Sequence, residues 1–435
     1  NMEVPEGEAF EKINFFLQRR GPDLTTRINS NGFTLVHNLL SMTGAGLTPQ
    51  PFESEDGQVV ALFNGEIYNF KDFGEYHSDG QCILPLYEKH RDASFVRELD
   101  GEFAIAVLDF RRNLVIYATD IFGTKPLFAA AGASGKSLVS DAHIGVSTYR
   151  SALEGVGHGN VEEVPANTII TRSLRFPYTE LKREHVHKFD TRQHKGSTVD
   201  WRAAFLRAVR KRIANVKYTV LVPLSSGYDS GAVSLALKEI GFRHTTMTIV
   251  GSEDRDVMER RTEFLREVVD PITLEWHERD LGTEQAHLDA YVEPYKCKIY
   301  AGERQYCLHD VSDELVQPKR TVVTRYAVRK DKASIGLSAI ARKAREEETL
   351  VLLSGSGADE IMTDYGFNGE GIFQHSCLRG HFPANLSAVW PWTNVFKGTQ
   401  RAYLHKEELV AGSHGIEARY PFLDKEVVQE YLWLT

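Results

Sequence analysis

Hydroxyl groups, a glycine and a carboxylate directly follow an apolar run in segment 224–231, which reads LSSGYDSG. Small residues allow the backbone to come close to a phosphate, and the N–H groups at the start of a helix attract anions. We therefore predict a loop that cradles nucleotide phosphates, with hydroxyl donors at Ser225 and Ser230. Asp229 adds an oxygen ligand of the kind that Mg²⁺ prefers. The alternative is a plain helix N-cap, because serine and aspartate also favour that position.

A second carboxylate of the same kind is Asp359, in segment 353–360, which reads LSGSGADE and also follows an apolar run. Two carboxylates and a triphosphate form an ordinary site for a hard cation, so Asp359 is predicted to share one Mg²⁺ with Asp229. The alternative for Asp359 is again a helix N-cap. Segment 224–231 lacks the GK[ST] ending of a Walker P-loop, which argues against hydrolysis between the β and γ phosphates.

The elements around these two segments alternate between strand and helix. Apolar runs predict strands at 219–224, 245–250 and 350–353, and apolar residues at helical spacing predict helices at 201–216, 232–240 and 342–348. Such alternation predicts an α/β domain with a parallel sheet flanked by helices. Residues 290–332 show no pattern that assigns them a structure.

The first half of the chain differs, because short β-rich runs alternate there with turns. Strands are predicted at 59–63, 103–108, 114–118, 137–140 and 168–171. Two of them, 103–108 and 114–118, are apolar throughout and joined by a charged turn, which indicates a hairpin buried on both faces. We predict an α+β domain of stacked antiparallel sheets. A polar stretch at 180–197 is predicted to be a linker, which gives domains at 1–180 and 198–435.

The overall composition is that of an ordinary globular protein. The 435 residues are 42% hydrophobic and 26% charged, with a formal net charge of −9. This negative balance argues against a general nucleic-acid binder. Apolar runs of 18 residues are absent, so no membrane helix is expected. Four cysteines without a CxxC pair indicate neither a zinc site nor a disulfide framework, so a reducing, cytoplasmic setting is expected.

Several segments carry a resemblance to a known family. Segment 224–231 resembles the SGGxDS pyrophosphate loop of the N-type ATP pyrophosphatases, with Ser226 in place of the first glycine. Segments 353–360 and 415–424 (GIEARYPFLD) resemble the SGEGSDE and GxEARxPFLD motifs of asparagine synthetase and its relatives. Further matches are RGPD at 20–23, NGEIYN at 64–69, SD at 78–79, DGEFA at 100–104 and DIFGTKPL at 120–127. Nearly the whole chain is thus similar to this family, in the same motif order.

The resemblance implies a fold and a reaction. The first domain would be a glutamine-amidotransferase-like domain of the N-terminal-nucleophile type, and the second an adenine-nucleotide α-hydrolase-like domain that uses ATP and Mg²⁺. A small-molecule carboxylate would be adenylated and then attacked by an amine, with release of AMP. A homodimer is also implied. Implied catalytic residues are Asp229, Asp359 and Ser356, with Asp229 and Asp359 as metal ligands. Implied nucleotide contacts are Leu224, Ser225, Ser226, Gly227, Asp229, Ser230, Thr248, Val250 and Gly355.

The sequence departs from the family where glutamine is hydrolysed. Members with that activity begin with a nucleophilic cysteine, and no Cys-Gly-Ile opening occurs here. Cys82 lies in a helical pattern and is expected in the core. Segment 37–42, which reads HNLLSM, lacks the arginine of the family's glutamine site, whereas Asn64, Gly65 and Asp79 remain and are expected to preserve turns and packing. We predict that this domain is inactive in glutamine hydrolysis, as in the related β-lactam synthetases, where the substrate supplies its own amine.

Two departures concern the second domain. Ser356 stands where the family has a glutamate or tyrosine, and serine is a poor base without assistance. The family's charge-stabilising lysine would lie beyond Thr435, and Lys332, Lys397 and Lys406 are unranked substitutes, each with a plain solvated lysine as the alternative. The leading prediction is an AMP-forming amide synthetase. An ammonia-dependent asparagine synthetase and a nucleotide-binding pseudoenzyme are the alternatives. For Glu417 and Arg419 a structural ion pair is preferred.

Overall fold

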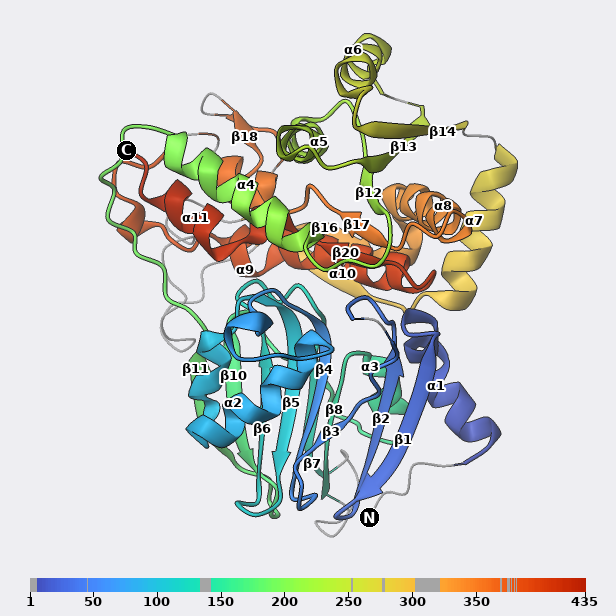
Figure 1. Ribbon diagram of the computed structural model, residues 1–435, viewed down its shortest axis with the longest axis vertical. Helices are drawn as coiled ribbons and strands as arrows, with labels where there is room; N and C mark the ends of the chain where they lie inside the picture. The colour runs from blue at the N-terminus through green and yellow to red at the C-terminus, as the bar shows by residue number, and fades with distance from the viewer. Residues whose placement is uncertain are drawn as a thin grey trace. The chain divides into compact units, whose positions relative to one another are not determined.

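The computed structural model describes residues 6–44, 46–133, 142–251, 253–275, 278–301, 321–367, 370–373, 376, 378, 380 and 382–435. Its chain divides into two compact units (Figure 1). Unit 1 comprises Asn1–Lys188 and Asn215–Lys217, and unit 2 comprises Phe189–Ala214 and Tyr218–Thr435. The strand predicted at 137–140 lies outside the described residues. No helix among those described is long and apolar enough to span a bilayer.

Unit 1 is rich in strands. Its helices are α1 (Glu8–Arg20), α2 (Ile83–His90) and α3 (Arg150–Gly155). Its strands are β1 (Leu24–Ser30), β2 (Phe33–Leu39), β3 (Phe52–Glu53), β4 (Val59–Ile67), β5 (Gly101–Asp109), β6 (Leu114–Thr119), β7 (Phe128–Ala133), β8 (Ala142–Ser147), β9 (Glu162–Glu163), β10 (Thr168–Ser173) and β11 (Glu180–His185).

Six of these strands pair antiparallel in the order β11-β10-β6-β5-β4-β3. Side chains alternate between the two faces of a strand, and in β5 both faces are buried. Phe103, Ile105 and Val107 belong to one hydrophobic cluster, which also contains residues of α2. Ala104, Ala106 and Leu108 belong to another, against which residues of the β1–β2 and β7–β8 pairs pack. The predicted hairpin with two buried faces is therefore confirmed.

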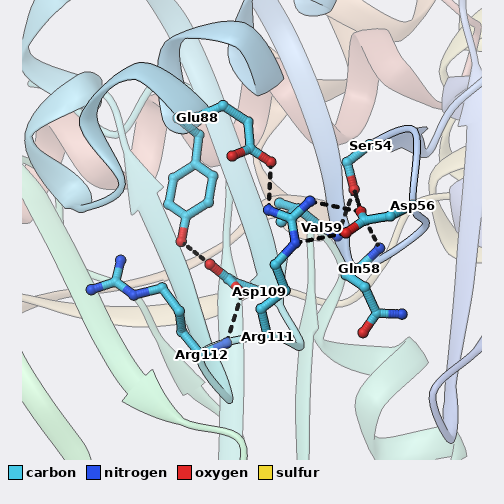
Figure 2. Close-up of polar contacts among 9 residues, drawn as sticks. Ser54, Asp56, Gln58, Val59, Glu88, Asp109, Arg111 and Arg112 are labelled. Atoms are coloured by element: carbon cyan, nitrogen blue, oxygen red, sulfur yellow. Dashed lines mark hydrogen bonds and ion pairs between the residues drawn. The ribbon is translucent and has the colours of Figure 1, made fainter.

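Charged side chains tie the turn of this hairpin to its surroundings (Figure 2). Arg111, between β5 and β6, donates to both oxygens of Asp56 at 2.6 and 2.8 Å and to Glu88 of α2 at 2.8 Å. Asp109 accepts a 2.6 Å hydrogen bond from the Tyr87 hydroxyl and a 2.9 Å bond from the Arg112 N–H. The polar residues between the two apolar runs thus fix the turn.

The prediction of a linker at 180–197 is wrong in its first part. Residues Glu180–His185 form β11, which pairs antiparallel with β10 at the edge of the sheet. Their side chains are charged because an edge strand faces solvent, and such residues discourage pairing with another chain. Ion pairs such as Arg183–Glu180 at 2.8 Å hold them in place. The polar composition of residues 180–185 therefore led to the prediction of a linker where the structure has the strand β11.

Unit 2 alternates helices and strands. Its helices are α4 (Val199–Ile213), α5 (Tyr228–Ile240), α6 (Arg255–Leu265), α7 (Glu278–Tyr291), α8 (Lys332–Glu346), α9 (Thr393–Phe396), α10 (Gly398–Gly412) and α11 (Lys425–Leu432), with a π-helical turn at Asp359–Thr363. Its strands are β12 (Val220–Pro223), β13 (His244–Val250), β14 (Val269–Glu275), β15 (Lys296–Ala301), β16 (Thr321–Ala327), β17 (Val351–Leu353), β18 (Gly366–Phe367), β19 (Glu370–Gly371) and β20 (Glu417–Arg419).

Five of these strands form a parallel sheet in the order β14-β13-β12-β17-β20. The predicted α/β architecture is confirmed. The central strands β12 and β17 are apolar along their length because both faces of a parallel sheet are covered. Helices α4, α5 and α11 pack together, as do α7, α8 and α10 (Figure 1).

The strand order reverses between β12 and β17. From β12 the chain proceeds to β13 and β14 on one side, and the later strands β17 and β20 lie on the other. In open parallel sheets, ligands bind beyond the carboxyl ends of the strands at such a switch point. The two segments singled out from the sequence, 224–231 and 353–360, follow β12 and β17 directly. The topology therefore brings both to one place.

Candidate active site

The loop after β12 is shaped by its own serines. The Ser230 hydroxyl lies 3.0 Å from the Ser225 hydroxyl and accepts the Ser225 N–H at 3.1 Å, while the Ser225 hydroxyl accepts the Gly227 N–H at 3.2 Å. Gly227 is the N-cap of α5, and no side chain caps the helix there. The alternative of a plain serine or aspartate N-cap is therefore wrong. The hydroxyls instead hold a tight loop at the start of a helix, as an anion site requires.

The turn after β17 touches this loop through Gly355. A Cβ at Gly355 would lie 2.8 Å from the Asp229 Cβ and 3.2 Å from the Ser230 N atom. Only a residue without a side chain allows this approach, which accounts for the glycine. The two segments therefore lie against each other at Gly355.

Burial raises the pKa of both carboxylates, Asp229 and Asp359. Burial, together with the nearby charges of Asp359 and Glu360, raises the pKa of Asp229 to about 7. Burial also raises the pKa of Asp359, although a hydrogen bond from the Thr363 hydroxyl opposes this. Among the described residues, Asp229 receives neither a hydrogen bond nor a cation. Like charges held together without a partner are typical of functional sites.

Glu360, the next residue, has a different role. Its side chain is buried, accepts the Gly357 N–H at 2.9 Å, and is hydrogen-bonded by the Tyr365 hydroxyl. The Trp392 indole donates to its carbonyl at 2.7 Å. Glu360 therefore fixes the turn from inside, and Asp359 remains the half-buried carboxylate near Asp229. Asp359 begins a π-helical turn whose N-cap is Ala358, so the N-cap alternative is wrong here too.

These two carboxylates fit a magnesium ion held mainly by a nucleotide. Among the described residues, no three His, Cys, Asp or Glu side chains come together as a metal site. Mg²⁺ commonly takes one or two carboxylates and completes its octahedron with phosphate oxygens and water. The donor set Asp229 and Asp359 suits that mode. At Asp229, burial and the charges of Asp359 and Glu360 raise the pKa, and a bound cation would offset both effects.

Glu253 and Arg261 also contact the loop, and neither was predicted. The Glu253 carboxylate accepts the Ser226 N–H at 2.5 Å and the Ser226 hydroxyl at 2.6 Å. Arg261 of α6 donates to the carbonyls of Ser225 and Gly227, the latter at 2.7 Å. The Glu253 carboxylate thus accepts a hydrogen bond from the Ser226 N–H, a group that we expect to bind phosphate. The serine that replaces the usual glycine gains a hydrogen-bond partner in Glu253.

The remaining predicted nucleotide contacts lie on or beside β13. The Thr248 hydroxyl donates to the Leu224 carbonyl at 2.8 Å, which fixes the start of the loop. Leu224 is buried, and its N–H binds the Met247 carbonyl at 3.0 Å. Val250 ends β13, directly before the segment that carries Glu253.

Ser356 has a partner that the sequence did not reveal. Its hydroxyl donates to the Glu407 carboxylate of α10 at 2.7 Å. Burial raises the pKa of Glu407, although the nearby ammonium of Lys406 and the Ser356 hydroxyl favour the charged form. A raised pKa suits a carboxylate that accepts a proton near neutral pH. The Ser356 hydroxyl is therefore hydrogen-bonded to a carboxylate whose neutral form is favoured by burial.

The segment 415–424 has a structural role. Arg419 donates to Glu417 at 2.8 Å and to the Arg212 carbonyl at 2.7 Å, with both side chains buried in β20, so the expected ion pair is confirmed. Asp424 is also buried and binds Arg212 at 2.8 Å as well as Lys211. Burial alone would raise the pKa of Asp424, but the two cations hold it at about 2.

The predicted remnants of a glutamine site lie in unit 1. Asp79 accepts the Ile67 N–H at 2.8 Å, and Asn64 accepts from Arg20 at 3.3 Å. The Asn64 amide nitrogen is buried without a partner among the described residues. Gly65 has φ 132°, and a Cβ there would lie 1.9 Å from the Glu102 carbonyl oxygen. Packing therefore requires this glycine whatever the domain does.

Segment 37–42, where the family's arginine is expected, contains neither Lys nor Arg, although the Lys217 ammonium donates to the Ser41 hydroxyl at 2.7 Å. Asn38 instead exchanges hydrogen bonds with Asn14 of α1, at 3.1 and 2.7 Å, and accepts from Thr25 at 2.7 Å. His37 is uncharged at neutral pH because burial lowers its pKa to about 4. Cys82 is buried in the core, as predicted, and burial raises the pKa of its thiol to about 12.

Glu253, Glu407 and Arg261 were missed for a common reason. Each reaches the site from an element that shows no motif, and the pairing is a tertiary contact. A weak signal exists for Glu253, because it lies between β13 and α6, next to Asp254, which caps α6 by accepting the Val257 N–H at 3.0 Å. No signal existed for Glu407 in the helical segment 398–412.

Two models of known protein families match successive parts of this chain. A model of the glutamine amidotransferase domain matches residues 1–193, and a model of asparagine synthase matches residues 200–388. A putative glutamine-hydrolysing asparagine synthetase of Methanocaldococcus jannaschii is 25% identical over 415 residues, which are 91% of this chain and 68% of that protein.

Two eukaryotic relatives match over a similar span. The glutamine-hydrolysing asparagine synthetase of Gallus gallus is 27% identical over 464 residues, covering 96% of this chain and 73% of the relative. An enzyme of the same name from Saccharomyces cerevisiae is 26% identical, covering 95% of this chain and 71% of the relative. Because both domain models match in the family's order and the relatives align almost throughout, the chain belongs to the asparagine synthetase family of ATP-dependent ligases that form carbon–nitrogen bonds.

Proposed function

We propose that this protein adenylates a substrate carboxylate at the loop after β12 and joins it to an amine that does not come from glutamine. The observation that carries this proposal is the contact of Gly355 with Asp229, which unites the two carboxylate-bearing turns at the switch point of the sheet. One loop alone would be compatible with simple nucleotide binding. Two poorly partnered carboxylates beside a phosphate loop are suited to catalysis on a phosphate chain.

The first half-reaction uses the loop. The substrate carboxylate attacks the α-phosphorus of ATP, the bond to the bridging oxygen breaks, and pyrophosphate leaves with that electron pair. The Ser226 N–H is suited to hold the pyrophosphate once a phosphate oxygen displaces the Glu253 carboxylate. The Gly227 N–H, which donates to the Ser225 hydroxyl over 3.2 Å, is suited to the same role once it exchanges that acceptor for phosphate. Asp229 and Asp359 would hold Mg²⁺, which neutralises charge on the phosphates when it is bound.

The second half-reaction uses Ser356 and Glu407. The amine attacks the carbonyl of the acyl-adenylate, and AMP leaves. An attacking amine must lose a proton, which the Ser356 oxygen is placed to accept while its own proton passes to Glu407 over the 2.7 Å hydrogen bond. The raised pKa of Glu407 makes it a suitable final acceptor.

This pairing predicts a selective defect. We expect Glu407→Gln to slow amide formation by roughly 100-fold, in the range of general base catalysis, and to leave ATP–pyrophosphate exchange nearly unchanged. Rapid-quench measurement of product amide and of exchange in the same variant would separate the two steps. An equal loss of both would show that Glu407 supports the whole site and is not the base.

The proposal on the amine source rests on the remnant glutamine site. Asn38, which is held by Asn14 and Thr25, and His37, which burial keeps neutral, offer no positive charge for a glutamine carboxylate. The relatives named above hydrolyse glutamine, so this is a proposed difference from them.

AMP release is the experiment that tests the amine source. The protein would be incubated with ATP, Mg²⁺ and a panel of amino and β-amino acids, with added ammonium, added glutamine or neither. We expect turnover without glutamine, and no glutamate formed when glutamine is present. Turnover only with aspartate and ammonium would indicate an ammonia-dependent asparagine synthetase. Stoichiometric glutamate release would contradict the proposal.

A further inference from the structure

The backbone N–H groups of the loop after β12 fall into two sets. Those of Ser225 and Gly227 donate to serine hydroxyls of the loop itself, at 3.1 and 3.2 Å. The Ser226 N–H donates instead to the Glu253 carboxylate at 2.5 Å. The Tyr228 N–H, at the first residue of α5, has no acceptor among the described residues. The two N–H groups that the loop does not use for itself are therefore those of residues 226 and 228.

Arg261 of α6 holds the other end of the same two peptide units. Its Nη1 donates to the Ser225 carbonyl, and to the Gly227 carbonyl at 2.7 Å. The Ser225 carbonyl belongs to the peptide unit that carries the Ser226 N–H. The Gly227 carbonyl belongs to the unit that carries the Tyr228 N–H. One guanidinium group thus contacts both of the peptide units whose N–H groups are available to a ligand.

A trans peptide fixes the direction of its N–H group once its carbonyl is held, because the two groups lie in one plane and point to opposite sides. Both of these peptide bonds are trans. Carbonyls that point toward Arg261 therefore turn the N–H groups of Ser226 and Tyr228 away from it. The Ser226 N–H shows the consequence, since it meets a carboxylate there. A cation at the carbonyl oxygen also polarises the peptide and makes its N–H a stronger donor.

Gly231, at the end of the first turn of α5, makes room for this guanidinium group. A Cβ at Gly231 would lie 2.9 Å from Arg261 Cζ, 3.1 Å from Nη2 and 3.2 Å from Nη1. The three atoms nearest to such a Cβ all belong to Arg261. A helix favours alanine over glycine, so the space that Arg261 occupies accounts for a residue that helix propensity does not favour.

We propose that Arg261 is a positioning residue of the first half-reaction. By holding two carbonyls of the loop, it directs the N–H groups of Ser226 and Tyr228 at the phosphates that leave as pyrophosphate. These N–H groups then stabilise the charge that pyrophosphate gains as its bond to the α-phosphorus breaks. Arg261 acts through the loop, without touching the reacting atoms. This inference rests on the proposed function, because it assigns the anion that the two N–H groups bind.

Binding of pyrophosphate provides a direct test. Arg261→Met keeps an unbranched apolar side chain and removes the donors. We expect it to weaken the binding of pyrophosphate with Mg²⁺ by at least roughly tenfold, since two charge-assisted hydrogen bonds lose their alignment. The affinity for AMP, which lacks the two leaving phosphates, should stay the same. Calorimetry on the full chain measures both, and Arg260→Met, which removes an exposed guanidinium group of the same helix, is the matched control.

Gly231→Ala displaces the guanidinium group without removing it. We expect this variant to bind pyrophosphate more weakly than the native protein, with an unfolding free energy in urea that is unchanged or higher. The double variant should bind pyrophosphate no more weakly than Arg261→Met alone, because both changes act through one group. Arg261→Lys keeps a cationic donor and should recover part of the affinity. A tie between α6 and the loop that served stability alone would predict none of these selective effects.

Three outcomes would overturn the assignment. They are full pyrophosphate affinity in Arg261→Met or Gly231→Ala, equal losses of affinity for pyrophosphate and AMP in Arg261→Met, and additive losses in the double variant. A native protein that exchanges ATP with pyrophosphate, and an Arg261→Met variant with the same KM for pyrophosphate, would remove this inference alone. A native protein that binds neither pyrophosphate nor ATP would remove the proposed function together with it.

Discussion

The motif carboxylates of the two units are held in opposite ways. Asp79 in unit 1 accepts the Ile67 N–H at 2.8 Å and the Ser78 hydroxyl at 3.2 Å, so the chain itself stabilises its charge. Asp229 in unit 2 receives no such bond among the described residues, and burial with Asp359 nearby raises its pKa. The charged form of Asp79 is therefore stabilised by the fold, whereas the charged form of Asp229 destabilises it.

This contrast separates a retained motif from a retained activity. Residues of NGEIYN and SD persist in unit 1 because turns and packing need them. At Gly65, for example, any side chain would clash with the Glu102 carbonyl oxygen. Unpaired charge at Asp229 has no such explanation, and proteins keep such groups where a ligand will pair with them. A motif match alone does not distinguish these two cases, but the partners of each side chain do.

The largest expected effect is on chemistry in unit 2. We expect Asp229→Asn to lower ATP–pyrophosphate exchange by roughly 100- to 1000-fold, since it removes a charged group that stabilises the reacting phosphates through Mg²⁺. The same change in unit 1, Asp79→Asn, should leave exchange unaltered in protein that remains folded by circular dichroism. Equal losses of exchange in Asp229→Asn and Asp79→Asn would contradict the different roles of these two carboxylates.

A stability effect of similar size is expected at Asp424. The pKa of this buried carboxylate is held at about 2, below its usual 3.8, so its contribution is present above pH 4 and is lost as pH falls through 2. Asp424→Asn would leave Lys211 and Arg212 without their partner, and we expect about 3–5 kcal/mol lower unfolding free energy at pH 7. Urea denaturation measures this, and a loss below 1 kcal/mol would contradict the role assigned to the ion pairs.

Asp229 should show the reverse dependence. Its folded pKa of about 7 exceeds the unfolded value, so the folded state binds the extra proton and stability falls as pH rises from 4 to 7. We expect Asp229→Asn to raise unfolding free energy at pH 8 by about 1–2 kcal/mol, less than the full shift implies because part of the group is solvated. At pH 4 the variant should match the native protein. If Asp229→Asn instead lowered the unfolding free energy at pH 8, measured without Mg²⁺ or nucleotide, charged Asp229 would not destabilise the folded protein.

The smallest expected effect concerns Glu253, which holds the Ser226 N–H. A neutral amide binds that N–H more weakly and does not repel phosphate, so we expect Glu253→Gln to tighten Mg·ATP binding by roughly three- to tenfold. Calorimetry measures the change in affinity. Glu259→Gln, in the following helix α6, removes an equal charge and is the matched control. Weaker binding in Glu253→Gln would show that this carboxylate assists the nucleotide.

Local patterns predicted much of the fold and half of the site. Apolar runs located β5, β6, β12, β13 and β17, because buried strands need little else to be recognised. β11 was missed, since an edge strand has a polar sequence like that of a linker. Asp229 and Asp359 were predicted because they lie in segments that directly follow apolar runs, and Gly355 was implied by the family resemblance. Glu407 was not assigned, because its significance depends on the packing of α10 against the turn after β17.

The measurement that tests the central claim most directly is identification of the phosphorus products of ATP. Phosphorus NMR of the protein with ATP, Mg²⁺ and the panel of amino and β-amino acids distinguishes cleavage at the α-phosphate from cleavage at the γ-phosphate. The loop without a Walker lysine and the paired carboxylates predict AMP and pyrophosphate in equal amounts, formed only when an acid is present. Formation of ADP and phosphate, or intact ATP with every acid, would contradict an AMP-forming ligase.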